Sequence, residues 1–95
     1  DRAMTQLLDD AQIREHLAQS PAWQHRGTTI LRTFERRDFV AAIGFVTSTA
    51  ILAERADHHP DIDIRWNRVT LTLSTHSAGG LTGKDFALAR SIDAL

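Results

Sequence analysis

Apolar and polar residues follow two different periods along this chain, one helical and one extended. Between residues 38 and 57 the apolar positions recur at intervals of three and four, which predicts a long helix. Its main apolar stripe comprises Phe39, Ile43, Val46, Ala50 and Ala53, and a second stripe beside it comprises Phe45, Thr49, Leu52 and Ala56. A helix that is apolar around so much of its circumference should be buried on more than one side. We therefore expect it to lie on a sheet and to contact another helix or subunit, with Gly44 at a close helix contact.

The extended period appears in two pairs of segments. Residues 62–66 and 69–75 alternate on either side of Asn67-Arg68, which predicts a hairpin with a two-residue connection. Strand parity then directs Val69, Leu71 and Leu73 toward the core. Residues 22–25 and 28–35 predict a second hairpin around the turn signal Arg26-Gly27.

Helices at both ends complete the expected order. Residues 4–19 predict a first helix that ends at Ser20-Pro21. The spacing of Thr82 and Asp85 is typical of a capping box at the start of a final helix. The order α-β-β-α-β-β-α predicts an α+β fold, a four-stranded antiparallel sheet with three helices on one face. We expect residues 1–95 to form a single domain.

Composition and charge narrow the possible partners and location. The chain has 95 residues and a formal net charge of −1, which argues against a broad nucleic-acid or membrane footprint. It contains no cysteine, which excludes disulfides and thiolate chemistry. No run reaches the roughly 18 uninterrupted apolar residues of a membrane span, and the start lacks the pattern of a signal peptide. We expect a cytoplasmic protein that gains stability from oligomerisation, because so small a domain buries a limited core.

Three of the five histidines gather in two short segments. His58 and His59 stand at the end of the long helix, before Pro60, and His76 ends the second hairpin. Proline disfavours the helical conformation in the residue before it, so His59 should already be leaving the helix. Glu54 lies four residues before His58 and should share a helix face with it. Histidines titrate near neutrality, so this group suits general acid–base chemistry.

Each of these residues also has a purely structural interpretation. Histidines at a helix C-terminus favour the negative end of the helix dipole, and Asp85 has a sufficient explanation as a capping residue. Trp23 fits a core position as well as a pocket wall. We expect Trp66 to be a packing or interface residue, because it precedes a tight turn.

The motif as a whole resembles one known family. Glu54-x-x-x-His58-His59-Pro60, the aromatic Trp66, Leu73-Ser-Thr-His76 and Asp85 follow the signature of the pterin-4a-carbinolamine dehydratases. The similarity covers residues 7–94, and the family has the same αββαββα order. It implies removal of water from a 4a-hydroxytetrahydropterin to give quinonoid dihydropterin, without a metal or organic cofactor.

The resemblance also implies roles for individual residues. His58, His59 and His76 match the family's active-site histidines, with His58 and His76 expected to transfer protons and His59 to bind and orient the pterin. Substrate-binding residues by the same resemblance are Glu54, Trp23, Thr75 and Asp85. The implied partners are a pterin substrate, a second copy in a homodimer or homotetramer, and an aromatic amino acid hydroxylase in the same pathway.

Two other functions compete with this interpretation. Three histidines and a carboxylate could hold zinc, although adjacent histidines are awkward ligands for one ion. Some animal members of the family bind a transcription factor, and the apolar long helix could likewise make this chain an interaction module.

Overall fold

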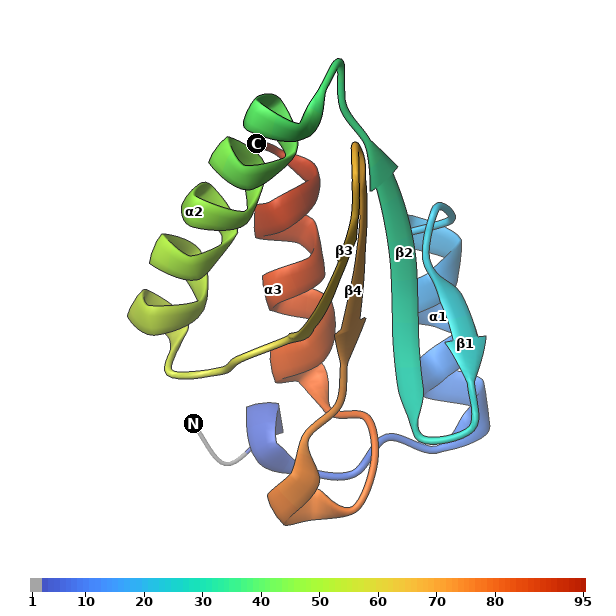
Figure 1. Cartoon of the computed structure of the whole chain (residues 1–95). Coiled ribbons are helices and arrows are strands. Elements are labelled where there is room, and N and C mark those ends of the chain that lie inside the picture. Colours follow the sequence, from blue (N-terminus) through green and yellow to red (C-terminus); the bar gives the residue numbers. More distant parts are fainter. Residues whose placement is uncertain (1–2) are drawn as a thin grey trace.

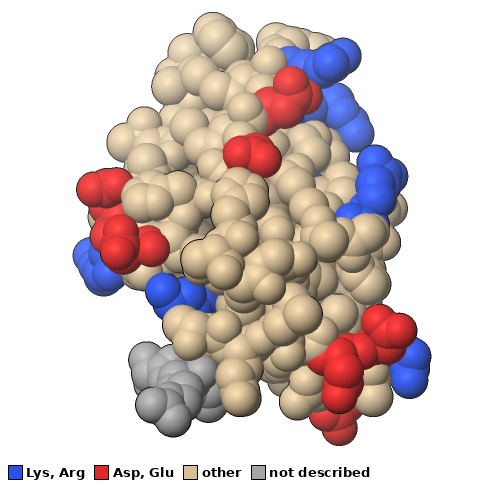
Figure 2. Space-filling model, turned by 90° about the horizontal axis from the view of Figure 1, so that it is seen from below, with Lys and Arg blue, Asp and Glu red and all other residues tan. Residues whose placement is uncertain are grey.

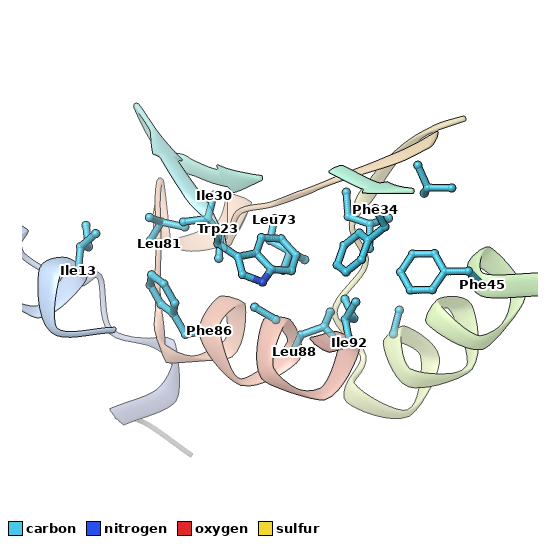
Figure 3. Packing of buried hydrophobic residues seen from close by; sticks show 14 of the residues in the cluster. Ile13, Trp23, Ile30, Phe34, Phe45, Leu73, Leu81, Phe86, Leu88 and Ile92 are labelled. Carbon is cyan, nitrogen blue, oxygen red and sulfur yellow. The ribbon is translucent and has the colours of Figure 1, made fainter. Parts of the chain in front are cut away.

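The computed structural model describes residues 3–95 as one layer of strands covered by helices (Figure 1). A four-stranded antiparallel sheet has the strand order β1-β2-β4-β3. The elements, with short 3-10 helices marked η, are η1 (Ala3–Thr5), α1 (Asp10–Gln19), β1 (Gln24–Arg26), β2 (Thr29–Glu35), α2 (Phe39–Ala56), β3 (Asp61–Arg65), β4 (Arg68–Leu73), η2 (His76–Ala78) and α3 (Gly83–Asp93). All three α-helices lie on one face of the sheet, with α3 in the middle (Figure 3). The predicted fold class and element order are confirmed.

The core forms where α3 meets the two central strands. Alternate residues of β4 are buried as predicted (Val69, Leu71 and Leu73), and Ile30 and Phe34 of β2 point into the same layer (Figure 3). The predicted core side of α3 is also buried: Phe86, Ala89 and Ile92. Burial of a large apolar side chain contributes about 1.5–3 kcal/mol, so this layer fixes α3 and its N-terminus against the end of β4.

The first helix is shorter than predicted, because it begins at Asp10 and not at Met4. Asp9 is its N-cap: the Asp9 carboxylate accepts a hydrogen bond from the Gln12 N–H, and the Gln12 side chain accepts one from the Asp9 N–H. This reciprocal cap satisfies two N–H groups that a helix start leaves unpaired. Residues 3–5 instead form η1, which lies against α3.

The turn of the second hairpin is one residue earlier than predicted. Trp66 and Asn67 form it, and Arg65 pairs with Arg68. The Asn67 side chain donates a hydrogen bond to the Arg36 carbonyl at 2.9 Å, and this contact holds Asn67 inside the turn. Trp66 adopts a positive φ of 53° and is 70% exposed, so it has no packing role within the chain. In the first hairpin, β1 covers residues 24–26 instead of 22–25.

The long helix α2 faces the core with residues of both predicted stripes. Phe45 and Thr49 of the second stripe are buried, as are Ala53 of the main stripe and Ala42, whereas Phe39, Ile43 and Ala50 of the main stripe are exposed. The reason is that α2 packs mainly against α3 and β4 on one side, and among residues 3–95 no further layer covers its other side. A Cβ atom added to Gly44 would meet nothing within 4 Å, so the expected close contact at Gly44 does not occur within the chain.

The same helix is 18 residues long with a mean hydropathy of 1.4, which is enough to cross a membrane by length and composition alone. Core helices of water-soluble domains pass the same test, and α2 does contribute Phe45 and Ala53 to the core cluster. The side of α2 that faces away from the core is nevertheless apolar and exposed.

Candidate active site

The end of α2 directs two histidines out of the helix. Asp57 caps the helix in the left-handed conformation (φ 49°, ψ 44°), and the N–H groups of Asp57 and His58 both bond back to the Ala53 carbonyl. This arrangement satisfies the last carbonyls of the helix and reverses the chain. His58 and His59 consequently leave the helix in different directions, before Pro60 leads into β3.

His58 turns inward and bonds to Asp85. Its Nε2 atom lies 2.6 Å from Asp85 Oδ1, and the side chains are 10% and 0% exposed, respectively. Asp85 stands in the first turn of α3, where it completes the predicted capping box with Thr82. A fully buried carboxylate requires hydrogen-bond donors, and Asp85 has three: the His58 ring, the Thr75 hydroxyl and the Thr82 N–H.

His59 turns outward, toward solvent. Its Nε2 atom lies 2.6 Å from Glu54 Oε1, and the two side chains are 56% and 79% exposed. The sequence predicts that Glu54 shares a face with His58, and this prediction is wrong. The left-handed Asp57 ends the helical repeat before His58 is reached, so Glu54 pairs with the next histidine instead.

His76 reaches the same region from the segment that follows β4. It opens η2, directly after Thr75, whose N–H bonds to the Gly80 carbonyl at 2.9 Å. This bond closes the loop between β4 and α3 and leaves the His76 side chain exposed. Since β4 and α2 end at the same end of the molecule, the two histidine segments meet there (Figure 1).

All three predicted histidines line one cleft of about 290 Å³. This volume is near the lower end of the range for small-molecule sites, roughly 300–1,000 Å³. Its lining comprises Asp57, His58, His59, Ser74, Thr75, His76, Ser77 and Lys84. The cleft therefore brings together imidazoles from a helix end and from the end of a hairpin.

Four lining residues were missed from the sequence: Asp57, Ser74, Ser77 and Lys84. Lys84 did carry a signal, because a cation in the first turn of a helix opposes the helix dipole and so has no stabilising explanation there. Asp57 had no comparable signal, since its left-handed conformation became visible only in the structure.

The remaining predicted site residues lie outside the open part of the cleft. Trp23 is 3% exposed in the core, and its indole N–H donates to the Asp93 carboxylate near the end of α3 (Figure 3). It does not line the cleft, and its assignment as a pterin wall gains no support. Asp85 lies beneath His58 and contacts the ring of that histidine.

Among the described residues, the end of the molecule that carries the cleft has no continuous charged patch. Figure 2 views this end, and acidic and basic side chains form small separate groups on it. Within residues 3–95, no three histidine or carboxylate side chains are arranged to hold a metal ion. The zinc alternative thus gains no support, because His58 and His59 each bond to a different carboxylate.

The fold and the cleft together define a small α+β domain with three histidines around one cleft. Residues 6–95 match the family model described as pterin 4 alpha carbinolamine dehydratase, and the chain belongs to this family.

Close relatives cover almost the whole chain. A protein of Roseiflexus castenholzii is 58% identical over 90 residues, which is 95% of this chain and 97% of the relative. A protein of Chloroflexus aurantiacus is 62% identical over 86 residues, 90% of this chain and 92% of the relative. Both carry the name "Putative pterin-4-alpha-carbinolamine dehydratase".

Solved structures share the fold. The crystal structure of a transcriptional coactivator/pterin dehydratase from Brucella melitensis superposes with a TM-score of 0.87 at 38% identity, over 92% of this chain and 95% of that one. A pterin dehydratase-like protein described as a RuBisCO assembly factor in the alpha-carboxysome gives a TM-score of 0.66 at 24% identity, over 77% and 87% of the two chains. This second likeness shows a common fold only.

Proposed function

We propose that this chain dehydrates a 4a-hydroxytetrahydropterin to quinonoid dihydropterin and water. The observation that carries the proposal is the cleft in which His58, His59 and His76 meet. Family membership and relatives named as dehydratases support the same reaction class.

The proposed chemistry needs two proton transfers. A base removes the proton from N5 of the pterin, the electron pair of that bond forms the N5–C4a double bond, and the C4a–O bond breaks. An acid protonates the departing hydroxyl, which leaves as water, so that no redox partner is consumed. We assign the base to His58, which Asp85 orients, and the acid to His76. General acid–base catalysis by positioned side chains contributes typically 10²–10⁴-fold.

Other residues at the cleft would bind the substrate. His59 lines the cleft, and together with its partner Glu54 it would orient the hydroxyl or the ring, whereas the Thr75 hydroxyl is taken up by its bond to Asp85. Lys84 adds a cation that can donate hydrogen bonds to carbonyl or hydroxyl groups of the substrate. The supplying reaction would be that of an aromatic amino acid hydroxylase, and the pathway would be tetrahydrobiopterin recycling in the cytoplasm. No cofactor is required by this scheme.

The test is the decay of a 4a-hydroxytetrahydropterin followed with and without the purified protein. Wild type should accelerate the decay, and His76→Ala should reduce the acceleration by about 10²-fold or more. His25→Ala is the matched control, since His25 bonds to the Gly27 carbonyl in the first hairpin, outside the cleft. Equal decay rates with and without wild-type protein would refute the proposal.

We also propose that the chain functions as a homodimer or homotetramer. The outer face of α2 (defined here as Phe39, Val40, Ile43, Thr47, Ala50 and Ile51) carries no charge and is exposed. On the edge of the sheet, Ile62 and Ile64 of β3 are also exposed. Contiguous apolar surface of this kind commonly marks a protein interface.

The alternative of an interaction module depends on the same surface. A structural relative is described as a transcriptional coactivator as well as a pterin dehydratase, and the outer face of α2 could bind another protein. A double variant of His58 and His76 that retained the full biological effect of the protein would favour this alternative over the enzyme.

A further inference from the structure

Beneath the cleft, two buried threonine hydroxyls bond to each other, and one of them, that of Thr75, also bonds to the Asp85 carboxylate that holds His58. Thr75 is 5% exposed and Thr82 fully buried, and their Oγ1 atoms lie 2.8 Å apart. Thr75 precedes η2 and Thr82 caps α3, so the contact joins the two ends of the loop that carries His76. A pair of hydroxyls placed there requires an explanation, because buried polar groups are costly unless they are hydrogen-bonded.

The proton positions in this cluster follow from the partners. An ionised carboxylate only accepts, so the Thr75 hydroxyl donates to Asp85 Oδ2 at 2.8 Å. A hydroxyl has one proton, so Thr82 must donate in the bond between the two threonines. Thr82 Oγ1 in turn accepts from the Lys84 N–H at 3.2 Å.

This order leaves one oxygen of Asp85 for the histidine. Oδ2 receives the Thr75 hydroxyl and the Thr82 N–H, and Oδ1 receives Nε2 of His58. A neutral imidazole carries its proton on a single nitrogen. With the proton on Nε2, the lone pair is on Nδ1, the nitrogen that a general base needs.

We infer that Thr75 and Thr82 are a positioning pair that fixes His58 in the tautomer with the proton on Nε2. Thr75 supplies the donor that saturates Oδ2 of Asp85, and Thr82 orients the Thr75 hydroxyl. Thr75 then acts through Asp85 and His58 and not by contact with the pterin. The inference rests on the proposed dehydration for its catalytic consequence, but the tautomer can be measured without substrate.

The test combines ¹⁵N NMR of the histidine rings with steady-state kinetics on Thr75→Val and Thr75→Ser. Valine keeps the shape of threonine and removes the donor, so Asp85 should bind the shared proton more strongly, while Nδ1 of His58 takes up a proton from solvent and the ring stays neutral. In Thr75→Val the Nε2 signal of His58 should move from the shift of a protonated nitrogen toward that of an unprotonated one. The value of kcat should fall about tenfold or more, the effect of losing a hydrogen bond to a charged group, while KM changes less than about twofold.

Thr75→Ser keeps the hydroxyl and should restore both the ring signal and kcat. Thr72→Val is the matched control, because Thr72 lies on β4 with its side chain on the face opposite the core and outside the cleft. Circular dichroism would confirm that each variant folds, and Thr75→Cys, a weak donor of similar size, provides an intermediate case if the valine variant unfolds.

The outcomes separate the two proposals. An unchanged Nε2 signal in folded Thr75→Val, or in Thr75→Cys if only that variant folds, would overturn the positioning role. A raised KM with unchanged kcat would do the same, by showing a direct substrate contact. A shifted Nε2 signal in a protein whose wild type has no dehydratase activity would support the positioning pair and reject the proposed function.

Discussion

His58 and His59 are neighbours in sequence but occupy different environments. His58 is nearly buried against a fully buried carboxylate, whereas His59 pairs with an exposed one. An exposed ion pair contributes about 0–1 kcal/mol. A buried charge that loses its partner is far more costly, about 3–5 kcal/mol. The two histidines should therefore respond very differently to substitution.

We predict that His58→Gln lowers kcat for dehydration by about 10²–10³-fold. Glutamine can still donate a hydrogen bond to Asp85, which preserves the fold, but it cannot accept a proton near neutrality. His59→Gln should change kcat by less than about tenfold, because its partner Glu54 is exposed and any loss falls mainly on binding. Steady-state kinetics on both variants provide the measurement. Equal losses of kcat at the two positions would contradict the assignment.

Thr49 is a residue whose chemistry does not suit its position. It is fully buried on the core side of α2, and its hydroxyl has no hydrogen-bond partner among the described residues. A buried hydroxyl without a partner costs roughly 1–3 kcal/mol. This hydroxyl does not line the cleft, and among the described residues it makes no hydrogen bond in the core.

Thr49→Val should accordingly raise the free energy of unfolding by about 1 kcal/mol, because valine has the same shape and no polar atom. Urea denaturation at a fixed protein concentration would measure it. The control is Thr28→Val in the first hairpin, where the side chain is exposed and lies outside the outer face of α2, so little change is expected. A loss of stability in Thr49→Val would indicate that the hydroxyl has a partner in the assembled protein.

At the scale of elements, the ends of the helices determine where the site lies. Asp57 ends α2 and separates the two histidines, while Thr82 and Asp85 begin α3 and place Asp85 under His58. Helix α1 begins in the same way, with the Asp9–Gln12 cap. The local sequence therefore contributes directly to the tertiary arrangement at these positions.

Replacement of Asp9 by alanine should lower the free energy of unfolding by about 1 kcal/mol, the typical effect of losing an N-cap. Asp10→Ala is the matched control: Asp10 is acidic, exposed and in the first turn, but makes no capping bond, so a few tenths of a kcal/mol are expected. Thermal or urea unfolding of both variants would distinguish them. Similar losses in the free energy of unfolding at the two positions would show that the negative charge stabilises the helix start and that the capping hydrogen bond does not.

Some of these elements were predicted correctly from the sequence and others were not. The capping box at Thr82, the buried alternation of β4 and the fold order follow from local rules and are confirmed. The start of α1 was wrong because apolar periodicity alone extended the helix past the Asp9 cap. The pairing of Glu54 with His59 depended on the backbone conformation of Asp57, an aspartate at a positive φ that no local pattern indicated.

At the scale of the whole molecule, the main error concerned the face of α2 that is buried. Both stripes of this helix are apolar, so periodicity could not rank them. Packing against α3 and β4 selected the stripe with Phe45 and Thr49 and left the outer face of α2 uncovered. The predicted contact on a second side of α2 would therefore have to come from a partner molecule, which a single chain does not contain.

If a second copy covers the outer face of α2, a charge there should separate the subunits. Val40→Glu is suited to this test, because Val40 is 79% exposed and a glutamate near a helix N-terminus favours the helix itself. Burial of an uncompensated charge in an interface costs several kcal/mol, so the dissociation constant should rise at least about 100-fold. Sedimentation velocity of wild type and variant would show the change in mass.

Ala18→Glu supplies the control, since Ala18 is exposed on α1, away from the outer face of α2, and the added charge is the same. The control should keep the mass of wild type, and both variants should keep their helix content. In wild type the unfolding midpoint should also rise with protein concentration, because subunit association stabilises the folded state by mass action. A wild-type protein that sediments as a monomer at every concentration would contradict the proposed assembly, and the outer face of α2 would then be available to a different partner.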